Sequence, residues 1–414
     1  MKPIHAPLLL LFLSLLLTLN AHAQRYLQPV FGQTTLLSAI PYGESVSWNG
    51  TSAPLLLDLY LPAGDTATRR PLLLLFHGGS FIGGARTDAY MQDMCTYFAR
   101  RGYVAATVGY RLGVNVGNVA GFQDEFIRAA IRATHDAKAA ARFFRKTFTE
   151  SNNPYGIDTA RIYAGGYSAG AITAIHLAWL KNSALTSQQV QTNLAALNAG
   201  LEGLSGNPGF HSGVEAVVNL AGAVLDTQVI QAGYVPAIHF HGTADQTVPY
   251  ARGPVRAMNL NILTVDGSSL IHQRLGNLQI VSEMNSFQGG GHDLISDTAR
   301  WNFILDRSCL FLYARLGGGA SGWGEPQATP SIRCYPNPVS DWVQVDGLSG
   351  SDHGSPNGES AEWALMDATG RCVRPLATLE SGGRIPLGDL SRGGYWLVLR
   401  HNRQTTYHKL VKVN

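Results

Sequence analysis

Ser168 lies between two glycines where an apolar run passes directly into a helical pattern, in "RIYAGGYSAGAITAIHLA", residues 161–178. A strand that turns so sharply into a helix crowds its own backbone, so the flanking positions Gly166 and Gly170 must be nearly free of side chain. Such a turn projects the serine hydroxyl and aims the N–H of Ala169, at the helix start, toward an oxyanion forming beside it. Because glycine and serine are also ordinary turn residues, and the chain has 46 glycines, the surroundings of the motif have to decide.

Runs with the length of buried strands alternate with segments of helical periodicity. The strands are expected at Leu55–Leu61, Leu72–Phe76, Tyr103–Val108, Arg161–Ala164, Val214–Leu220, Ala237–Phe240 and Leu278–Val281, and the helices at Thr87–Arg101, Gln123–Phe148, Ala169–Lys181 and Asp297–Leu316. This alternation predicts an α/β fold with a largely parallel sheet covered by helices on both faces. Residues 183–212 interrupt it, and we expect an insertion there that could cap the carboxyl edge of the sheet.

The first residues have the three regions of a secretory signal peptide. Lys2 precedes an apolar run from Leu8 to Leu17, and Ala21-His22-Ala23 follows it. We therefore expect residues 1–23 to be removed and the mature chain to begin at Gln24. The run is too short to cross a bilayer, whose core needs about 20 apolar residues, and no other membrane span is expected.

The composition changes abruptly after Leu316. Residues 317–330 are rich in small and turn residues and are interpreted as a linker. Beyond it, short alternating runs separated by turn residues predict a small antiparallel β-sandwich over residues 331–414, without a helix.

Charge and cysteine content limit the possible ligands. Only 14% of residues are charged, the net charge is +3, and there is no basic run, which argues against nucleic acid and favours a neutral substrate. The four cysteines, Cys95, Cys309, Cys334 and Cys372, permit disulfide bonds after export, and their spacing suggests no zinc site.

A second glycine-rich turn comes at the end of an earlier strand, in "LLLLFHGGSFIGG". There His77, Gly78 and Gly79 end the strand, and the glycines allow the backbone to approach a substrate. By analogy we expect the N–H groups of Gly79 and Ser80 to complete an oxyanion hole with Ala169, although a plain glycine turn is the alternative.

The motifs "HGGSF", "VGYRL", "DAKAAARFF", "YGIDTARIYAGGYSAG", "HGTADQTVPY" and "GGGHDL" occur in the order seen in α/β-hydrolase esterases. Over residues 30–316 the chain resembles secreted carboxylesterases that act on acylated polysaccharides. The resemblance implies an eight-stranded α/β-hydrolase domain within residues 24–316 and a catalytic triad in the chain order Ser, Asp, His.

Two further positions match the triad of that family. His292, in "FQGGGHDL", lies in the loop before the last helix, where the family carries its histidine, and Asp245, in "HGTADQTVPY", directly follows a strand. The competing histidines are His211, His239, His241 and His272, of which His239 and His241 could instead form a metal pair. Asp226 and Asp266 are poorer candidates for the carboxylate because neither follows that strand motif.

These residues support a hypothesis for the mechanism. His292 deprotonates Ser168, which attacks an ester carbonyl, the N–H groups of Gly79, Ser80 and Ala169 hold the oxyanion, and water releases the acyl group without metal or cofactor. The substrate would be a neutral ester on a small molecule or polysaccharide, such as an acetyl or feruloyl ester. A lipase or polyester hydrolase, a serine peptidase and a non-catalytic binding protein are the alternatives.

The C-terminal segment resembles the sorting domain of proteins exported by the type IX secretion system. The resemblance covers residues 330–414 and rests on "CYPNPVSDWVQV", "DATGRCV" and the final "LSRGGYWLVLRHNRQTTYHKLVKVN". It implies that the secretion machinery is a partner and that the mature protein is secreted or held at the cell surface after passing through the periplasm. A carbohydrate-binding sandwich is the alternative.

The hydrolase resemblance also bears on the cysteines. In that fold the first and last helices pack on the same sheet face, which implies a disulfide bond between Cys95 and Cys309, with two buried free thiols as the alternative. A bond between Cys334 and Cys372 is a weaker expectation.

Overall fold

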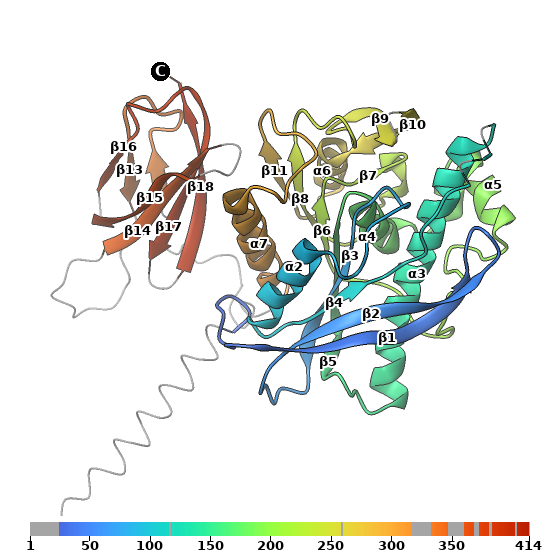
Figure 1. Ribbon diagram of the computed structural model, residues 1–414. Coiled ribbons are helices and arrows are strands. Elements are labelled where there is room, and N and C mark those ends of the chain that lie inside the picture. Colours follow the sequence, from blue (N-terminus) through green and yellow to red (C-terminus); the bar gives the residue numbers. More distant parts are fainter. Residues whose placement is uncertain are drawn as a thin grey trace, which may run out of the picture.

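The computed structural model describes residues 25–115, 117–118, 120–257, 260–316, 333–346, 360–367, 372–380, 383–401 and 404–413 (Figure 1). The expected signal peptide, the start at Gln24 and the linker at 317–330 lie outside the described residues. Among the helices that the structure describes, none combines the length and the apolar character needed to cross a membrane.

One eight-stranded sheet forms the centre of the N-terminal domain. Its strands are β1 (Thr34–Val46), β2 (Ser52–Pro62), β3 (Arg70–Phe76), β4 (Val104–Val108), β5 (Ile157–Tyr167), β6 (Val217–Leu220), β8 (Ala237–Gly242) and β11 (Ser282–Phe287). They lie in the order β1-β2-β4-β3-β5-β6-β8-β11. The six strands from β4 to β11 pair in parallel, and β1 and β2 join antiparallel at one edge. This confirms the predicted α/β class and mostly parallel sheet.

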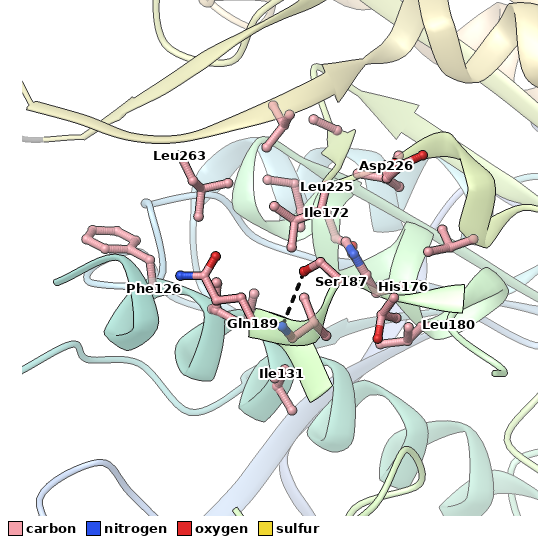
Figure 2. Close-up of a pocket in the computed structure, with 18 of the residues that line it drawn as sticks. Phe126, Ile131, Ile172, His176, Leu180, Ser187, Gln189, Leu225, Asp226 and Leu263 are labelled. Atoms are coloured by element: carbon pink, nitrogen blue, oxygen red, sulfur yellow. Dashed lines mark hydrogen bonds between the residues drawn. The ribbon is translucent and has the colours of Figure 1, made fainter. Parts of the chain in front are cut away.

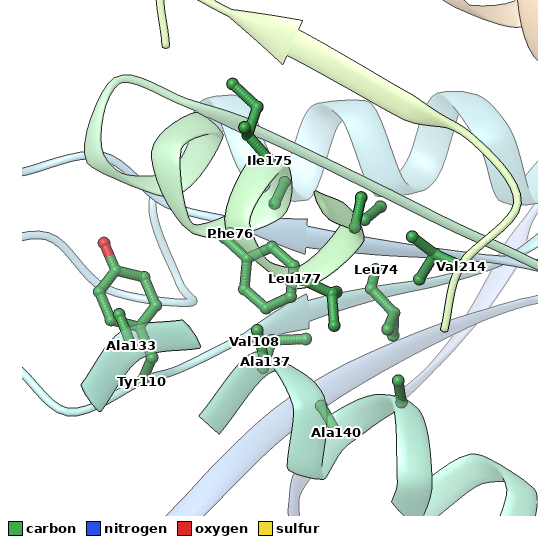
Figure 3. Packing of buried hydrophobic residues seen from close by; sticks show 14 of the residues in the cluster. Leu74, Phe76, Val108, Tyr110, Ala133, Ala137, Ala140, Ile175, Leu177 and Val214 are labelled. Atoms are coloured by element: carbon green, nitrogen blue, oxygen red, sulfur yellow. The ribbon is translucent and has the colours of Figure 1, made fainter. Parts of the chain in front are cut away.

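Helices cover both faces of this sheet. The central strand β3 alternates, with Leu72, Leu74 and Phe76 directed to one face and Leu73 and Leu75 to the other. The first face is covered by α3 (Phe122–Glu150), α4 (Ala169–Trp179) and α6 (Ser268–Asn277), and the second by α2 (Ala89–Ala99) and α7 (Thr298–Tyr313). Figure 3 shows the first face, where small residues of α3, such as Ala133, Ala137 and Ala140, let the helix lie close to the strands. The inner strands β3, β4, β6 and β8 are buried at every position, which explains why most of their residues are apolar.

The structure corrects one predicted strand, and the described part of this domain contains five strands that were not predicted, β1, β11 and three in a separate sheet. Leu278–Val281 is not a strand: Leu278 caps α6, and β11 begins only at Ser282. Three apolar residues in a run of four fit the end of a helix as well as a strand, and Ile280 packs against the core just after the helix. A separate three-stranded sheet, β7 (Ala223–Val224), β10 (Leu260–Gly267) and β9 (Arg252–Ala257), was not predicted.

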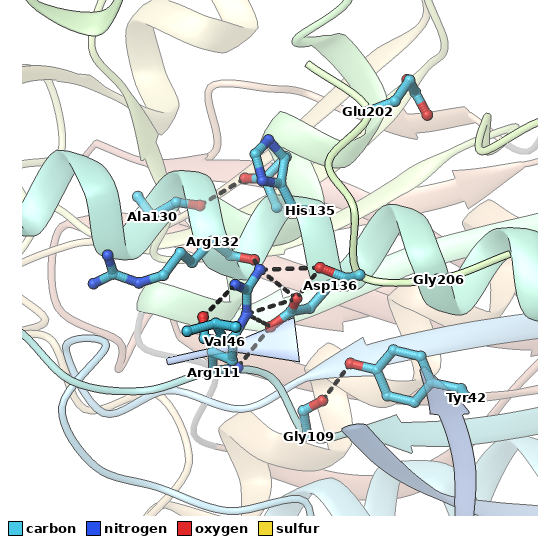
Figure 4. A network of polar contacts seen from close by, with 12 residues as sticks. Tyr42, Val46, Gly109, Arg111, Ala130, Arg132, His135, Asp136, Glu202 and Gly206 are labelled. Atoms are coloured by element: carbon cyan, nitrogen blue, oxygen red, sulfur yellow. Dashed lines mark hydrogen bonds and ion pairs between the residues drawn. The ribbon is translucent and has the colours of Figure 1, made fainter. Parts of the chain in front are cut away.

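Residues 183–212 form a short 3-10 helix at Ser183–Leu185, helix α5 (Gln188–Ala196) and a loop. This loop lies along α3. The loop is fixed by polar contacts, in which the carboxylate of Glu202 pairs with Lys138 and Arg142. The hydroxyl of Ser205 donates to the buried Asp136, which also pairs with Arg111 at 2.7 Å (Figure 4). These contacts place the segment along α3, and its role as a cap over the sheet edge stays a prediction.

The two sheets of the C-terminal part pair antiparallel in their described residues. One sheet contains β12 (Arg333–Tyr335), β13 (Trp342–Asp346) and β16 (Arg384–Pro386). The other contains β15 (Cys372–Glu380), β14 (Ser360–Asp367), β17 (Gly393–His401) and β18 (Gln404–Lys412). Apolar side chains of both sheets share one core, as expected for a small β-sandwich.

The expected disulfide bond between Cys95 and Cys309 is absent. The two residues lie in the same buried cluster but are free cysteines. The Cys309 thiol donates to the carbonyl oxygen of Tyr26 at 3.1 Å, and burial raises its pKa to about 12. Burial also raises the pKa of Cys95, whose thiol lies near Asp58 of β2. Cys334 is free as well, and the side chain of Cys372 lies outside the described residues.

Candidate active site

Ser168 sits in a sharp turn between β5 and α4. Its backbone has φ 57° and ψ −120°, a left-handed conformation that costs a non-glycine residue free energy. The N–H of Ser168 donates to the carbonyl of Leu220 on the neighbouring strand at 2.8 Å, which holds the turn. A Cβ atom at Gly170 would lie 1.9 Å from the carbonyl oxygen of Phe76, and one at Gly166 2.4 Å from the backbone of Gly170. Only glycine fits at these two positions, as the sequence predicted.

Three side chains that are far apart in the chain meet at this turn. The hydroxyl of Ser168 donates to Nε2 of His292 at 2.8 Å, and Nδ1 of His292 donates to Oδ2 of Asp245 at 2.6 Å. The residues follow β5, β8 and β11, whose carboxyl ends lie at one edge of the parallel sheet. The structure therefore brings together all three residues expected from the sequence.

The loops that carry Asp245 and His292 are locked to each other. Gly242, at the end of β8, has no room for a side chain, because a Cβ atom would lie 2.2 Å from the carbonyl oxygens of Gly290 and Gly291. The ring of His292 stacks on Tyr167, with ring centroids 5.3 Å apart, and the hydroxyl of Tyr167 donates to the carbonyl of His292. The orientation of the imidazole is thus fixed from two sides.

Asp245 is a buried carboxylate with donors on both oxygens. Its Oδ1 accepts the N–H groups of Thr247 and Val248, and its Oδ2 accepts from His292 and lies 3.2 Å from Nε2 of His241. Burial alone would raise the pKa of Asp245, but the hydrogen bonds from His241 and His292 outweigh it and hold that pKa well below its usual value. The carboxylate is therefore ionised at neutral pH.

His241 belongs to the site, although the sequence analysis set it aside. Its Nε2 faces two acceptors, Asp245 Oδ2 and the carbonyl of Val248 at 3.0 Å, so this nitrogen carries the proton. Its Nδ1 then accepts from the hydroxyl of Ser268 at 2.7 Å, and that hydroxyl accepts from Asn219 at 3.0 Å. A buried relay from Asn219 therefore ends on the same carboxylate oxygen that holds His292.

The remaining histidine and aspartate candidates lie elsewhere. His239 accepts from Asn219 at 2.8 Å, and burial lowers its pKa to about 3, so its ring is neutral. Asp226 caps a short turn, and Asp266 pairs with Arg252. His272 bonds to Ser282, and His211 lies near Arg145, which donates to its carbonyl. Within the described residues, no group of three His, Cys, Asp or Glu side chains could hold a metal ion.

The loop after β3 lies against Ser168. Gly79 has φ 111°, and a Cβ atom there would lie 2.1 Å from the carbonyl oxygen of Gly83, so the tight loop requires glycine. His77 donates from Nδ1 to the carbonyl of Gly78 at 2.7 Å and stacks on Tyr110. Within the described part of the chain, the N–H groups of Gly79, Ser80 and Ala169 have no acceptor. They are available to an oxyanion.

Family models match two segments of the chain. Residues 57–224, which include Ser168 and the loop after β3, match the BD-FAE family, and residues 333–413 match the secretion system C-terminal sorting domain. The chain combines an esterase-like α/β-hydrolase domain with a secretion sorting domain. The sorting domain implies export and either secretion or attachment at the cell surface. No curated protein matches the chain.

Solved structures of esterase 2 from Thermogutta terrifontis are similar to this chain. The form phosphorylated by paraoxon is 22% identical with a TM-score of 0.49, over 69% of this chain and 95% of that chain. The apo form is 23% identical with a TM-score of 0.49, over 67% and 94% of the two chains. The native form is 22% identical with a TM-score of 0.47, over 75% and 99%.

Proposed function

We propose that the hydrolase domain cleaves neutral carboxylic esters through an acyl-enzyme on Ser168. The observation that carries this proposal is the unbroken series of hydrogen bonds from Ser168 through His292 to Asp245. A serine hydroxyl is a weak nucleophile unless a base removes its proton, and the base must be held in one tautomer. The ionised Asp245 keeps the proton on Nδ1 of His292 and leaves Nε2 free to accept one.

The reaction proceeds in two halves. The Ser168 oxygen bonds to the ester carbonyl carbon as its proton passes to His292, and the oxyanion receives hydrogen bonds from Gly79, Ser80 and Ala169. The C–O bond to the alcohol then breaks, and His292 returns the proton to the departing oxygen. Water repeats the sequence on the acyl-enzyme, which releases the acid and restores Ser168. Each oxyanion donor contributes about 2.7 to 4 kcal/mol to stabilising the transition state.

We also propose the route by which this enzyme leaves the cell. Residues 1–23 direct the chain across the inner membrane and are then removed, so that the mature chain begins at Gln24. The sorting domain at residues 331–414 is the signal for type IX export. The match of residues 333–413 to a secretion sorting domain supports this route. The substrate is then an ester outside the cell, on a small molecule or a polysaccharide.

A mechanism-based probe tests the nucleophile. A fluorophosphonate forms a stable bond with an activated serine, so we expect stoichiometric labelling of the peptide that contains Ser168, read by mass spectrometry. Prior denaturation should abolish labelling, because the hydroxyl is activated only by the folded arrangement. Modification of another serine, or of none, would contradict the proposal.

His241 is expected to act as a positioning residue for Asp245. In H241N the shorter amide stays near Ser268 but no longer reaches the carboxylate, and we expect kcat to fall about tenfold with little change in KM, since one hydrogen bond to a charged group is lost. In H241Q the amide nitrogen occupies the place of Nε2, and activity should be largely restored. The measurement is the kcat and KM of both variants.

A pH profile separates this role from simple destabilisation. Without the His241 donor, the charge of Asp245 acts on His292 alone, so the acidic limb of the kcat/KM profile should move to higher pH in H241N. H272Q, which alters a histidine that bonds to Ser282 outside this relay, should leave the profile unchanged. Equal profiles and equal losses in H241N and H241Q would contradict the assignment.

A further inference from the structure

A cavity of about 600 Å³ lies beside the candidate active site, between α3, α4, the start of α5 and the β9–β10 hairpin (Figure 2). Its volume falls within the range of sites that bury a small organic ligand. Among the residues that line it are Phe81, Ile131, Ile172, Val190, Leu225 and Leu263. Neither Ser168 nor His292 lines the cavity itself, so it is a compartment next to the reacting groups.

Three parts of the wall are tied to the backbone around Ser168. Phe81 directly follows the proposed oxyanion donor Ser80. The N–H of Ile172 donates to the carbonyl of Ser168 at 3.0 Å, which places its side chain one turn along α4. Ala223 lies three residues after Leu220, whose carbonyl holds the N–H of Ser168. The cavity therefore adjoins the backbone that carries Ser168 and the proposed oxyanion donor Ser80.

The cavity is long as well as large. Ile172 and His176 on α4 and Leu180, the C-cap residue of that helix, all line it, and their spacing of four residues forms one row along the helix. Eight residues of helix correspond to about 12 Å at 1.5 Å per residue. An acetyl group would leave nearly all of this length empty, whereas an extended chain of roughly eight to ten carbons would occupy it.

The wall is mostly apolar, and most of its polar side chains have partners within the protein, including Asp226, which accepts the N–H of Gln228. Thr134 donates to the carbonyl of Ala130, Ser187 accepts the N–H of Val190, and Gln189 donates to Asp124. His176 donates from Nδ1 to the carbonyl of Ile172, and burial lowers its pKa, so it adds no charge. Arg252, which is exposed, pairs with Asp266. Burying a hydrocarbon chain here leaves these pairs intact, and each buried CH₂ group contributes about 0.8 kcal/mol.

We propose that this cavity is the acyl pocket and that the enzyme prefers esters of medium-chain aliphatic acids. This inference rests on the proposed ester hydrolysis and narrows its substrate class. The acyl chain follows the row of residues on α4, and the alcohol leaves on the side that faces solvent. Helix α5 forms part of the wall, which gives residues 183–212 a role in specificity.

Chain-length profiles test the proposal on the full mature protein. We expect kcat/KM for p-nitrophenyl esters to rise from acetate to octanoate by at least tenfold and to fall again beyond decanoate. Leu263→Trp projects an indole into the cavity and should lower the octanoate-to-acetate ratio at least tenfold. Leu260→Trp is the matched control, because Leu260 is on the same strand β10 but 52% exposed, and its ratio should equal that of the wild type.

Several outcomes would overturn the pocket assignment. One is a steady fall of kcat/KM from acetate to octanoate, and another is a chain-length preference found with alkyl acetates, in which the alcohol is varied. Faster hydrolysis of a p-hydroxycinnamoyl ester than of octanoate would assign an aromatic occupant instead. In each case Ser168-dependent hydrolysis would still support the proposed function.

A binding measurement tests the acyl pocket independently of ester hydrolysis at Ser168. The S168A protein should bind octanoate in calorimetry, and the S168A/L263W protein should bind it at least tenfold more weakly. If the wild-type protein hydrolysed no ester while S168A bound octanoate and S168A/L263W did not, the result would support the pocket and contradict the proposed function. No binding in S168A, or equal binding in both proteins, would contradict the pocket.

Discussion

Replacement of Ser168 by alanine is expected to lower kcat for ester hydrolysis by about 10⁴ to 10⁶-fold, the range found when single triad residues are removed, with loss of the nucleophile at its upper end. Alanine has no oxygen to form the acyl-enzyme, and the oxyanion hole and His292 can only assist direct attack by water. The measurement is the initial rate with the best p-nitrophenyl ester, with enzyme concentration high enough to follow a loss of this size.

The fold should survive this substitution. The side chain of Ser168 bonds to His292, and the backbone of the turn is held by Leu220 and by the two flanking glycines, none of which changes. We therefore expect the thermal unfolding midpoint of S168A to stay within a few degrees of the wild type. S269A, which removes a hydroxyl that donates to the carbonyl of Tyr250, is a matched control with full activity. Activity in S168A above about 1% of the wild type would exclude Ser168 as the nucleophile.

The sequence predicted the parts of this molecule that depend on neighbouring residues. The turn at Ser168 needs glycine two positions away on either side, and this requirement is visible in five consecutive letters. The parallel sheet was equally accessible, because strands buried on both faces are apolar throughout. The strand predicted at Leu278–Val281 was wrong, since a short run with three apolar residues also suits a helix end and a turn.

Contacts between distant residues were not visible in the sequence. His241, Ser268 and Asn219 lie on three different elements, and no local spacing connects them. Asp245 and His292 were found only because their surroundings match a known family. The disulfide bond predicted between Cys95 and Cys309 is absent, because the packing of two helices on one sheet face does not fix where their side chains point. Side-chain direction depends on packing that periodicity alone does not determine.

D245N is expected to reduce kcat by about 10⁴-fold, the loss known when a triad aspartate becomes asparagine. In the wild type, one oxygen of Asp245 accepts two backbone N–H groups and the other faces the N–H groups of two imidazoles. Asparagine has one oxygen and one NH₂ group, so it cannot satisfy both sides. The backbone donors of Thr247 and Val248 cannot change, and they will retain the oxygen.

The NH₂ group of the introduced asparagine would then face His292. Nδ1 must become an acceptor, which moves the proton to Nε2, and a protonated Nε2 cannot take the proton of Ser168. We therefore expect kcat to fall while KM changes little, and fluorophosphonate labelling of Ser168 to slow in parallel. D293N is the matched control, because Asp293 adjoins His292 but bonds to Ser296 and the N–H of Ile295. If D245N lost less than tenfold in kcat, His292 would not depend on Asp245 for its tautomer, and the charge that orients the base would have to come from elsewhere in the site.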